Sequence, residues 1–415
     1  MHVRFLHTIV AIVFSCCVTT VSFAAEPIKI AIITPLSGPF ALQGEDYVKQ
    51  FQGIADLVNG KGGVLGGRKL EIVPLDGKFT PQDSVLALNQ AIDQSITFVA
   101  SNGSSVAHAL SEAVAKHNSR NPERRVLLID VDSRDAALTE AKCNFWYFRF
   151  SHHTDTEVNF VTDYIASRKE VTKVYLINQD YAFGQGVSKA TKKMLVKKRP
   201  DIQIVGDELI PLGKVKDFAP YIAKIRAAGA DSVVTGNWGN DLNLLLKAGH
   251  ESGLTVNYYA LIAHTAGTVS AIGTAGADRM IGVLSWHANA EPNPYSRFNT
   301  EFKAKYKTSR NFDLIQVFRT VEMLVQAIDK AQSTDALKVA HKLEGMHYNG
   351  PSGDSWMRAE DHQMIVPVYL ARFTKAGLPG VKFDTENTGF GWKTEAKVEA
   401  KDAVPAMKCK MERPE

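Results

Sequence analysis

After Pro27 the chain alternates short runs rich in Val and Ile with longer amphipathic stretches, and this rhythm limits the fold more than any other feature. Short apolar runs predict buried strands, and the stretches between them predict helices that cover a sheet on both faces. Strands are predicted at Ile28–Thr34, Lys69–Leu75, Thr97–Ala100, Val126–Val131, Lys173–Asn178, Gln203–Glu208, Ser232–Gly236, Tyr258–Ile262 and Ile281–Ser285. Helices are predicted at Asp46–Asn59, Pro81–Gln94, Ala107–Asn118, Thr156–Ser167, Gly186–Lys198, Pro220–Ala228, Leu242–Gly249, Tyr295–Lys305 and Leu314–Ala331.

The pattern indicates an α/β protein with two doubly wound, Rossmann-like lobes, because 415 residues are too many for one ordinary core. The segment "FWYFRFSHHTDT" (145–156) interrupts the rhythm between the two sets of strands. We expect one lobe to contain residues 27–147 with 283–355, and the other residues 150–281 with 360–415. A late strand is predicted at Ile365–Phe373, and the tail beyond Lys375 is expected to be a meandering edge segment.

The first 24 residues are typical of a secretory signal peptide. Arg4 precedes an apolar stretch from Thr8 to Val21, and Ser22-Phe23-Ala24 places small residues before an expected cut after Ala24. The apolar stretch is shorter than the roughly 20 residues of a membrane span. Lipidation at Cys16 or Cys17 is the less favoured reading, since Phe14 occupies a position where a small residue is expected. We therefore expect a periplasmic protein.

Cleavage would leave two cysteines, Cys143 and Cys409. An exported chain meets an oxidising compartment, so we expect these two to form a disulfide. The alternative is a pair of buried free thiols.

Enzyme and metal signatures fail in specific ways. In "GKGGVLGGRK" (60–69) Leu65 replaces the third glycine of a dinucleotide fingerprint, and no phosphate-loop Lys-Ser/Thr follows. The histidines form no HExxH, the cysteines have no metal spacing, and the adjacent His152 and His153 are expected to be solvated loop residues. A net charge of +4, spread along the chain, does not indicate nucleic-acid binding. We expect no catalytic site, no cofactor, no metal and a monomer.

Polar and aromatic clusters follow several predicted strands, at the edge where open α/β sheets bind ligands. They are "SNGSSVAH" (101–108), "DVDSRDA" (130–136), "NQDYAFGQG" (178–186) and "TGNWGND" (235–241). Each cluster alone could be a helix cap. Trp238, between two glycines just past a strand, is either a loop anchor on the core or a wall of a ligand site. Recurrence in both lobes favours the ligand site.

The ordered motifs resemble the type I periplasmic solute-binding proteins of the branched-chain amino acid class. The amino-terminal stretch "IKIAIITPLSGPFALQGEDYVKQFQGIADLVNGKGGVLGGRKLEIVPLDGKFTPQDSV" carries most of the resemblance, and "QDYAFGQGV" and "KDFAPYIAKIRAAGADSVVTG" agree with it. The resemblance covers roughly residues 28–372. It implies two lobes joined by three crossing segments, a solute in the cleft, closure about a hinge, and delivery to a membrane permease with a cytoplasmic ATPase.

The resemblance also implies ligand contacts. Ser105 matches the hydroxyl that binds the solute carboxylate, Ser133 and Arg134 lie in the segment that completes that site, and Gln43 lies on the first loop. Phe183 and Trp238 match aromatic walls. The candidate ligand-binding residues are Gln43, Ser104, Ser105, Ser133, Arg134, Phe183, Asn237, Trp238, His264 and Asp313.

One departure bears on the solute. Members that bind amino acids hold the ammonium with an acid after a second-lobe strand, and "YYALIAHTAGT" (258–268) contains none. Because a buried, unpaired ammonium is costly, we expect a small carboxylate with an apolar or aromatic body, not an ordinary amino acid, unless Asp241, Asp180 or Asp313 replaces the missing acid. A periplasmic sensor of the same fold that reports to a receptor is the alternative to transport.

Overall fold

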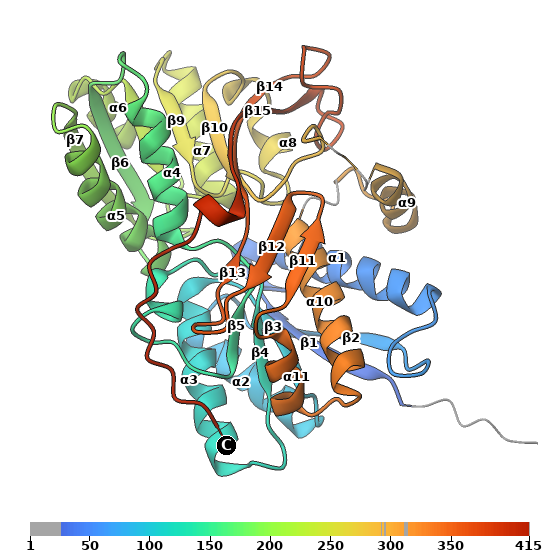
Figure 1. Cartoon of the computed structure of the whole chain (residues 1–415). Coiled ribbons are helices and arrows are strands. Elements are labelled where there is room, and N and C mark those ends of the chain that lie inside the picture. The colour runs from blue at the N-terminus through green and yellow to red at the C-terminus, as the bar shows by residue number, and fades with distance from the viewer. Residues whose placement is uncertain (1–25, 292, 294–295, 311–313, 415) are drawn as a thin grey trace, which may run out of the picture.

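The computed structural model describes residues 26–291, 293, 296–310 and 314–414. Two large sheets, one above the other in Figure 1, form the cores of two lobes. The predicted signal peptide (residues 1–24), with Cys16 and Cys17, lies outside the described residues, as does Asp313. Within the described residues, no helix combines the length and apolar character needed to cross a membrane.

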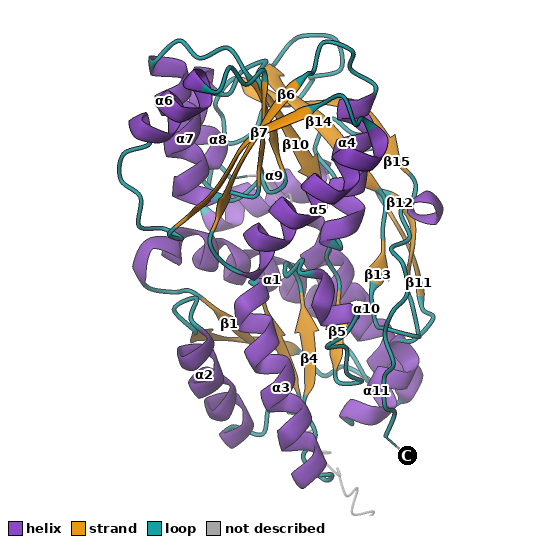
Figure 2. Ribbon diagram, turned by 90° about the vertical axis from the view of Figure 1, so that its left-hand side faces the viewer, coloured by secondary structure: helices purple, strands orange, loops and turns teal. Residues whose placement is uncertain are grey.

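The first lobe is built on a parallel five-stranded sheet with the order β2-β1-β3-β4-β5. Its strands are β1 (Ile28–Thr34), β2 (Leu70–Asp76), β3 (Phe98–Ser101), β4 (Leu127–Asp130) and β5 (Tyr147–Arg149). In Figure 2, α2 (Pro81–Asp93) and α3 (Ser104–Arg120) lie on one side of this sheet, and α10 (Ile315–Ala331) and α11 (Ala336–Leu343) lie on the other. Every residue of β3 and β4 is buried, as expected for strands covered on both faces.

The second lobe repeats this arrangement. Its sheet has the order β15-β14-β10-β9-β8-β6-β7. The five strands β7-β6-β8-β9-β10 correspond in order to β2-β1-β3-β4-β5 of the first sheet. The strands are β6 (Lys173–Gln179), β7 (Gln203–Ile210), β8 (Ser232–Thr235), β9 (Asn257–Ala260), β10 (Met280–Leu284), β14 (Val368–Lys375) and β15 (Phe390–Val398). The covering helices are α4 (Thr154–Ala166), α5 (Ala182–Lys198), α6 (Ala219–Ala227), α7 (Gly239–Glu251) and α8 (Thr268–Ile272). The predicted doubly wound α/β fold is confirmed.

Three details differ from the sequence-based expectations. Strand β10 pairs with β9 and β14, so the expected boundary between residues 281 and 283 is wrong and cuts a strand of the second lobe. The single strand predicted at Ile365–Phe373 is two strands, because Pro367, which has no N–H to donate, separates β13 (Met364–Ile365) from β14. A small antiparallel sheet of β11 (His347–Gly350), β12 (Gly353–Met357) and β13 was not predicted.

The chain passes between the lobes three times in the body of the fold. The first passage is residues 150–153, between β5 and α4. The second lies between β10 and α9 (Ser296–Tyr306), a helix that packs on α1 (Ala41–Gly60) of the first lobe through Phe302 and through a hydrogen bond from Tyr306 to Asp56. The third passage is residues 366–367, between β13 and β14.

The C-terminal tail makes a fourth connection. Ala403 belongs to the second-lobe core, and its carbonyl accepts a hydrogen bond from Thr156. Beyond it, the carbonyl of Pro405 accepts from Arg358 at 2.8 Å, and Cys409 forms the predicted disulfide with Cys143. The tail therefore runs down to the first lobe, as Figure 1 shows, and the expectation that residues 360–415 all belong to the second lobe is wrong.

Candidate functional site

A small cavity lies between the lobes at the carboxyl ends of the parallel strands. In each sheet the strand order reverses at a switch point, between β1 and β3 in the first lobe and between β6 and β8 in the second, which is where open α/β sheets bind ligands. The wall of the cavity comes from the segments after these strands and after β2, β4 and β9, and from the first turns of α1. Its lining residues are Pro35, Gln43, Tyr47, Phe79, Asn102, Gly103, Asp132, Tyr181, Trp238, Ile262 and Thr265.

The cavity measures about 30 Å³. Ligand pockets usually measure about 300 to 1,000 Å³. Larger depressions exist elsewhere on the described surface, but they lie away from the switch points. The lobes are therefore closed on each other in this structure, and a solute needs them to move apart before it can enter.

Aromatic rings from both lobes meet at this cavity. Trp238 lies 4.7 Å from Phe40 and 5.3 Å from Phe79, measured between ring centroids, and Phe40 lies 5.2 Å from Phe79. The indole Nε1 of Trp238 donates to the hydroxyl of Tyr181 at 2.9 Å. Trp238 is only 6% exposed because the first-lobe rings cover it. It is thus a wall of the cavity. Trp238 directly precedes α7, and the first residue of that helix, Gly239, has a φ of 56°, which favours glycine.

The start of α3 forms the first-lobe end of the cavity. Gly103 precedes the helix, and no side chain caps the first-turn N–H groups. Asn102 beside it is buried, and its Oδ1 has no hydrogen-bond partner in the protein. Ser104 does not line the cavity, and its hydroxyl accepts the backbone N–H groups of Arg134 and Asp135 at 3.1 and 3.2 Å. Ser105 is half-buried and does not line the cavity.

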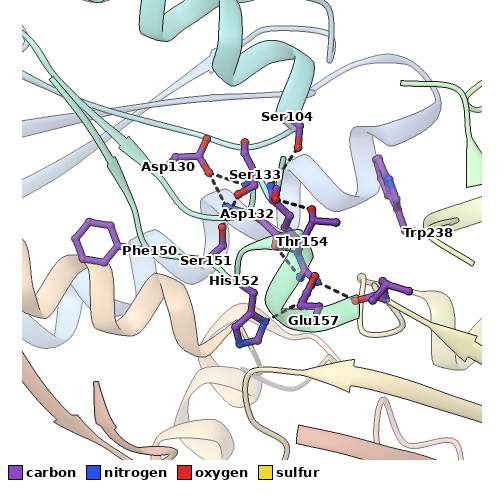
Figure 3. Close-up of polar contacts among 12 residues, drawn as sticks. Ser104, Asp130, Asp132, Ser133, Phe150, Ser151, His152, Thr154, Glu157 and Trp238 are labelled. Atoms are coloured by element: carbon purple, nitrogen blue, oxygen red, sulfur yellow. Dashed lines mark hydrogen bonds and ion pairs between the residues drawn. The ribbon is translucent and has the colours of Figure 1, made fainter. Parts of the chain in front are cut away.

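The Arg134 side chain makes its hydrogen bonds within the protein. Its guanidinium donates to Asp132 Oδ1 at 2.9 and 3.1 Å, to Glu157 Oε1 at 2.5 Å and to the carbonyl of Leu261 at 2.8 Å. Figure 3 labels Asp132 and Glu157 of this cluster, and Glu157 lies on α4 of the other lobe. Burial opposes the charge of Arg134, but the Glu157 and Asp132 carboxylates outweigh it and raise its pKa. The Arg134 guanidinium therefore does not offer a free pair of N–H groups to a solute carboxylate.

Asp132 is the acid that the cavity wall contains. Its Oδ1 faces Arg134, and its Oδ2 accepts a short hydrogen bond from the hydroxyl of Tyr47. Burial and then the charge of Asp132 raise the pKa of Tyr47 well above its usual value, so the phenol keeps its proton and donates. A carboxylate oxygen accepts more than one hydrogen bond, so Oδ2 has capacity for a donor from the cavity.

Asp130 shapes the loop that presents these groups. Its Oδ1 accepts the backbone N–H of Ser133 at 2.6 Å and that of Asp132 at 3.1 Å. The carbonyl of Ser133 in turn accepts the hydroxyl of Ser151, which follows β5. Ser133 thus holds the loop together and does not line the cavity. Burial raises the pKa of Asp130 to about 7.

The other candidates divide between the cavity and its surroundings. Gln43 lines the cavity and donates to the carbonyl of Ala266 across the cleft at 3.4 Å. Phe183 and Asn237 are fully buried in the second lobe and do not line the cavity. His264 is buried nearby, and its burial, followed by the charge of Arg134, lowers its pKa to about 4.

The acids proposed as replacements for the missing one lie elsewhere. Asp180 is exposed and accepts from Gln185. Asp241 binds Gln179 and the N–H of Gly213, which fixes a second-lobe loop. Neither lines the cavity.

The adjacent histidines are not solvated, contrary to expectation. His152 and His153 are each 2% exposed. His152 contacts Glu157 at 2.9 Å and the carbonyl of Pro367 at 3.2 Å, so it joins the first and third passages between the lobes. The described residues contain no group of side chains arranged to hold a metal ion.

Sequence reasoning overlooked Tyr47, Phe79, Asp132 and Tyr181. Asp132 and Tyr181 stood within quoted clusters, and their position after a strand was the available signal. Tyr47 lies on a face of α1 that resembles any core-facing helix position, and Phe79 lies in a turn whose φ values are not visible in the sequence.

The comparisons with known proteins agree with this geometry. The model of a family described as periplasmic binding protein matches residues 27–378. The Leu/Ile/Val-binding protein homolog 4 of Brucella abortus is 30% identical over 403 residues, which are 94% of each chain. A leucine-, isoleucine-, valine-, threonine-, and alanine-binding protein of Pseudomonas aeruginosa is 24% identical, with 80% of this chain and 86% of that one covered.

Solved structures share the fold. The closed conformation of a leucine-, isoleucine-, valine-, threonine-, and alanine-binding protein from Brucella ovis has a TM-score of 0.82 and 26% identity, over 94% of this chain and all of that one. A solute-binding protein from R. palustris in complex with benzoate has a TM-score of 0.76 over 92% and 99% of the chains, and at 19% identity it supports the fold alone. The chain belongs to the periplasmic binding protein family, whose members bind solutes and are not enzymes.

Proposed function

We propose that this protein is the periplasmic substrate-binding component of an ABC importer. It takes a small solute with a carboxylate into the cavity between the lobes, closes on it and delivers it to a membrane permease. The observation that carries the proposal is a cavity at two switch points, lined by both lobes and closed by rings from each. Two relatives are named as a homologue of a Leu/Ile/Val-binding protein and as a leucine-, isoleucine-, valine-, threonine-, and alanine-binding protein, and these names support a solute of the same class.

The start of α3 is the proposed place of the carboxylate. Helix N-termini favour anions because their first N–H groups lack partners and the helix dipole is positive there. Gly103 brings the backbone to the cavity without a side chain in the way, and the Asn102 side chain borders the same space. This arrangement replaces the expected contact from Arg134.

Asp132 is the proposed partner of a positively charged donor on the solute. The sequence argument against an amino acid rested on the absence of an acid at residues 258–268, but an acid on the first lobe borders the cavity instead. An α-amino acid carries both groups that these two ends of the cavity favour. We therefore propose an amino acid as solute, and this replaces the expectation of a plain carboxylic acid.

Calorimetric titration of alanine, valine, leucine and phenylalanine, beside their deaminated 2-keto acids, tests the assignment. Wild-type protein should bind at least one amino acid more tightly than its keto acid. Asp132→Asn should weaken amino acid binding by about 100-fold, because it removes one partner of a buried charge pair, and should change keto acid binding little. Asp180→Asn, an exposed carboxylate away from the cavity, is the matched control.

Tyr47→Phe gives a second readout that leaves the Asp132–Arg134 pair intact. It removes the donor on Oδ2 and should change amino acid affinity while the fold is kept. Tight binding of keto acids with none of the amino acids would reject the role of Asp132. Uptake of the bound solute by cells with and without the protein tests delivery, and equal uptake would reject the transport role.

A further inference from the structure

Phe79 lines the cavity from a turn with an unfavourable backbone conformation. Both Lys78 and Phe79 have left-handed backbone conformations, with φ values of 48° and 58°. Such values are rare for residues other than glycine, and for a bulky residue they mark a position that the surrounding structure enforces. Backbone strain of this kind is concentrated at ligand clamps and other functional sites.

The turn is fixed by hydrogen bonds on both sides of the ring. The N–H of Lys78 donates to Asp76 Oδ1 at 2.9 Å, and the N–H of Thr80 donates to the carbonyl of Gly77 at 3.0 Å. The Thr80 hydroxyl then caps α2 by accepting the N–H of Asp83 at 3.1 Å. The backbone that carries the phenyl ring is therefore held in place on both sides.

The ring lies beside the proposed carboxylate position. A Cβ atom at residue 103 would come within 2.5 Å of the Phe79 ring, so the ring packs directly on the backbone of Gly103. It also contacts Phe40 and Trp238, yet the residue is only half-buried because it borders the cavity. A solute whose carboxylate lies at the start of α3 has its body next to this ring.

We propose that Phe79 limits the size of the solute, by occupying the space that a larger solute body would need when the lobes close. The inference rests on the proposed function of the cavity. With the ring in place, the closed cavity of about 30 Å³ favours a short solute body. Without it, closure over a longer or aromatic body becomes possible.

The test is a comparison of large and small solutes in the same calorimetric panel. We measure the ratio of the dissociation constants of phenylalanine and alanine, and the same ratio for their 2-keto acids. Phe79→Ala should lower both ratios by tenfold or more, since differences of one methylene in such pockets are worth about 10- to 200-fold. Phe79→Leu should give an intermediate change.

Two controls separate the ring from the turn. Phe79→Tyr keeps the ring and adds a hydroxyl group, so the ratio should not fall below that of wild type. Lys78→Ala changes the adjacent left-handed residue, which does not line the cavity, and should keep the ratio. Circular dichroism spectra confirm folding of each variant. If wild-type protein binds the panel but Phe79→Ala leaves the ratio unchanged, the size limit is wrong and the proposed function stands. If neither protein binds any member of the panel, the proposed function fails and the size limit fails with it.

Discussion

Replacement of Asp130 by asparagine should make the protein more stable at alkaline pH. Asp130 ends β4 with no exposed surface, and its Oδ1 accepts two backbone N–H groups of the loop that presents Asp132. Burial raises its pKa from 3.8 to about 7. Asparagine keeps an acceptor oxygen in the same place and carries no charge at any pH, so it imitates the protonated carboxyl group.

The raised pKa of Asp130 determines how the free energy of unfolding changes with pH. Because the folded state holds the proton more tightly than the unfolded state, this group contributes stability that is full below pH 3.8 and is lost as the pH rises through 7. The rise of the Asp130 pKa from 3.8 to about 7 corresponds to about 4 kcal/mol over the whole range. Between pH 5 and pH 8 the loss amounts to roughly 2 to 3 kcal/mol.

Urea unfolding of wild type and Asp130→Asn at pH 5, 6, 7 and 8 measures this difference. The variant should already be more stable than wild type by roughly 1.5 kcal/mol at pH 5, and this difference should be larger by about 2 to 3 kcal/mol at pH 8. Other buried groups, such as Asp46, titrate in both proteins and cancel in the difference. Asp180→Asn serves as an exposed control. A variant that is less stable than wild type at pH 8 would show that Arg149 stabilises the charge more than burial opposes it, and would refute the reasoning.

Two further predictions concern stability. Replacing both Cys143 and Cys409 by serine should lower the free energy of unfolding by as much as about 5 kcal/mol, since the bond closes a loop with a sequence separation of 266 residues, and calorimetry of the variant against wild type checks this. Arg134→Met should cost about 3 to 5 kcal/mol in urea unfolding, because it leaves Glu157 and Asp132 buried without their partner. A loss below 1 kcal/mol in either variant would contradict the corresponding argument.

The arrangement of the fold was predictable because it depends on local patterns. Runs such as Ile28–Thr34 carry their own signal, and the structure places β1 at the same residues. The position of β10 was not predictable in this way. An apolar strand of Met280–Leu284 fits either sheet, and what assigns it to the second lobe is its pairing with β9 and β14, the latter nearly 90 residues further on.

The location of the candidate site could be predicted from the sequence, but the contacts of its side chains could not be predicted as well. Trp238 follows β8 at the switch point and lines the cavity, so its position after a strand was the signal for its location. Arg134 was expected to contact the solute, but its guanidinium binds Glu157, 23 residues later on the other lobe, and the carbonyl of Leu261. A positively charged residue in a sequence does not reveal which buried acids will surround it.

The C-terminal tail explains how such a buried cluster can coexist with movement of the lobes. Asp155 just after the first passage, Val368 just after the third, and Ala403 to Pro405 of the tail border one surface depression, so these connections lie together. The cluster of Arg134 and Glu157 lies close to the same passages, because Thr154 donates to the carbonyl of Arg134 and His152 contacts Glu157. A rotation about this region moves nearby groups least and distant groups most. The ion pairs can then persist while the rings of Phe40 and Trp238, which meet across the cavity, separate to admit a solute.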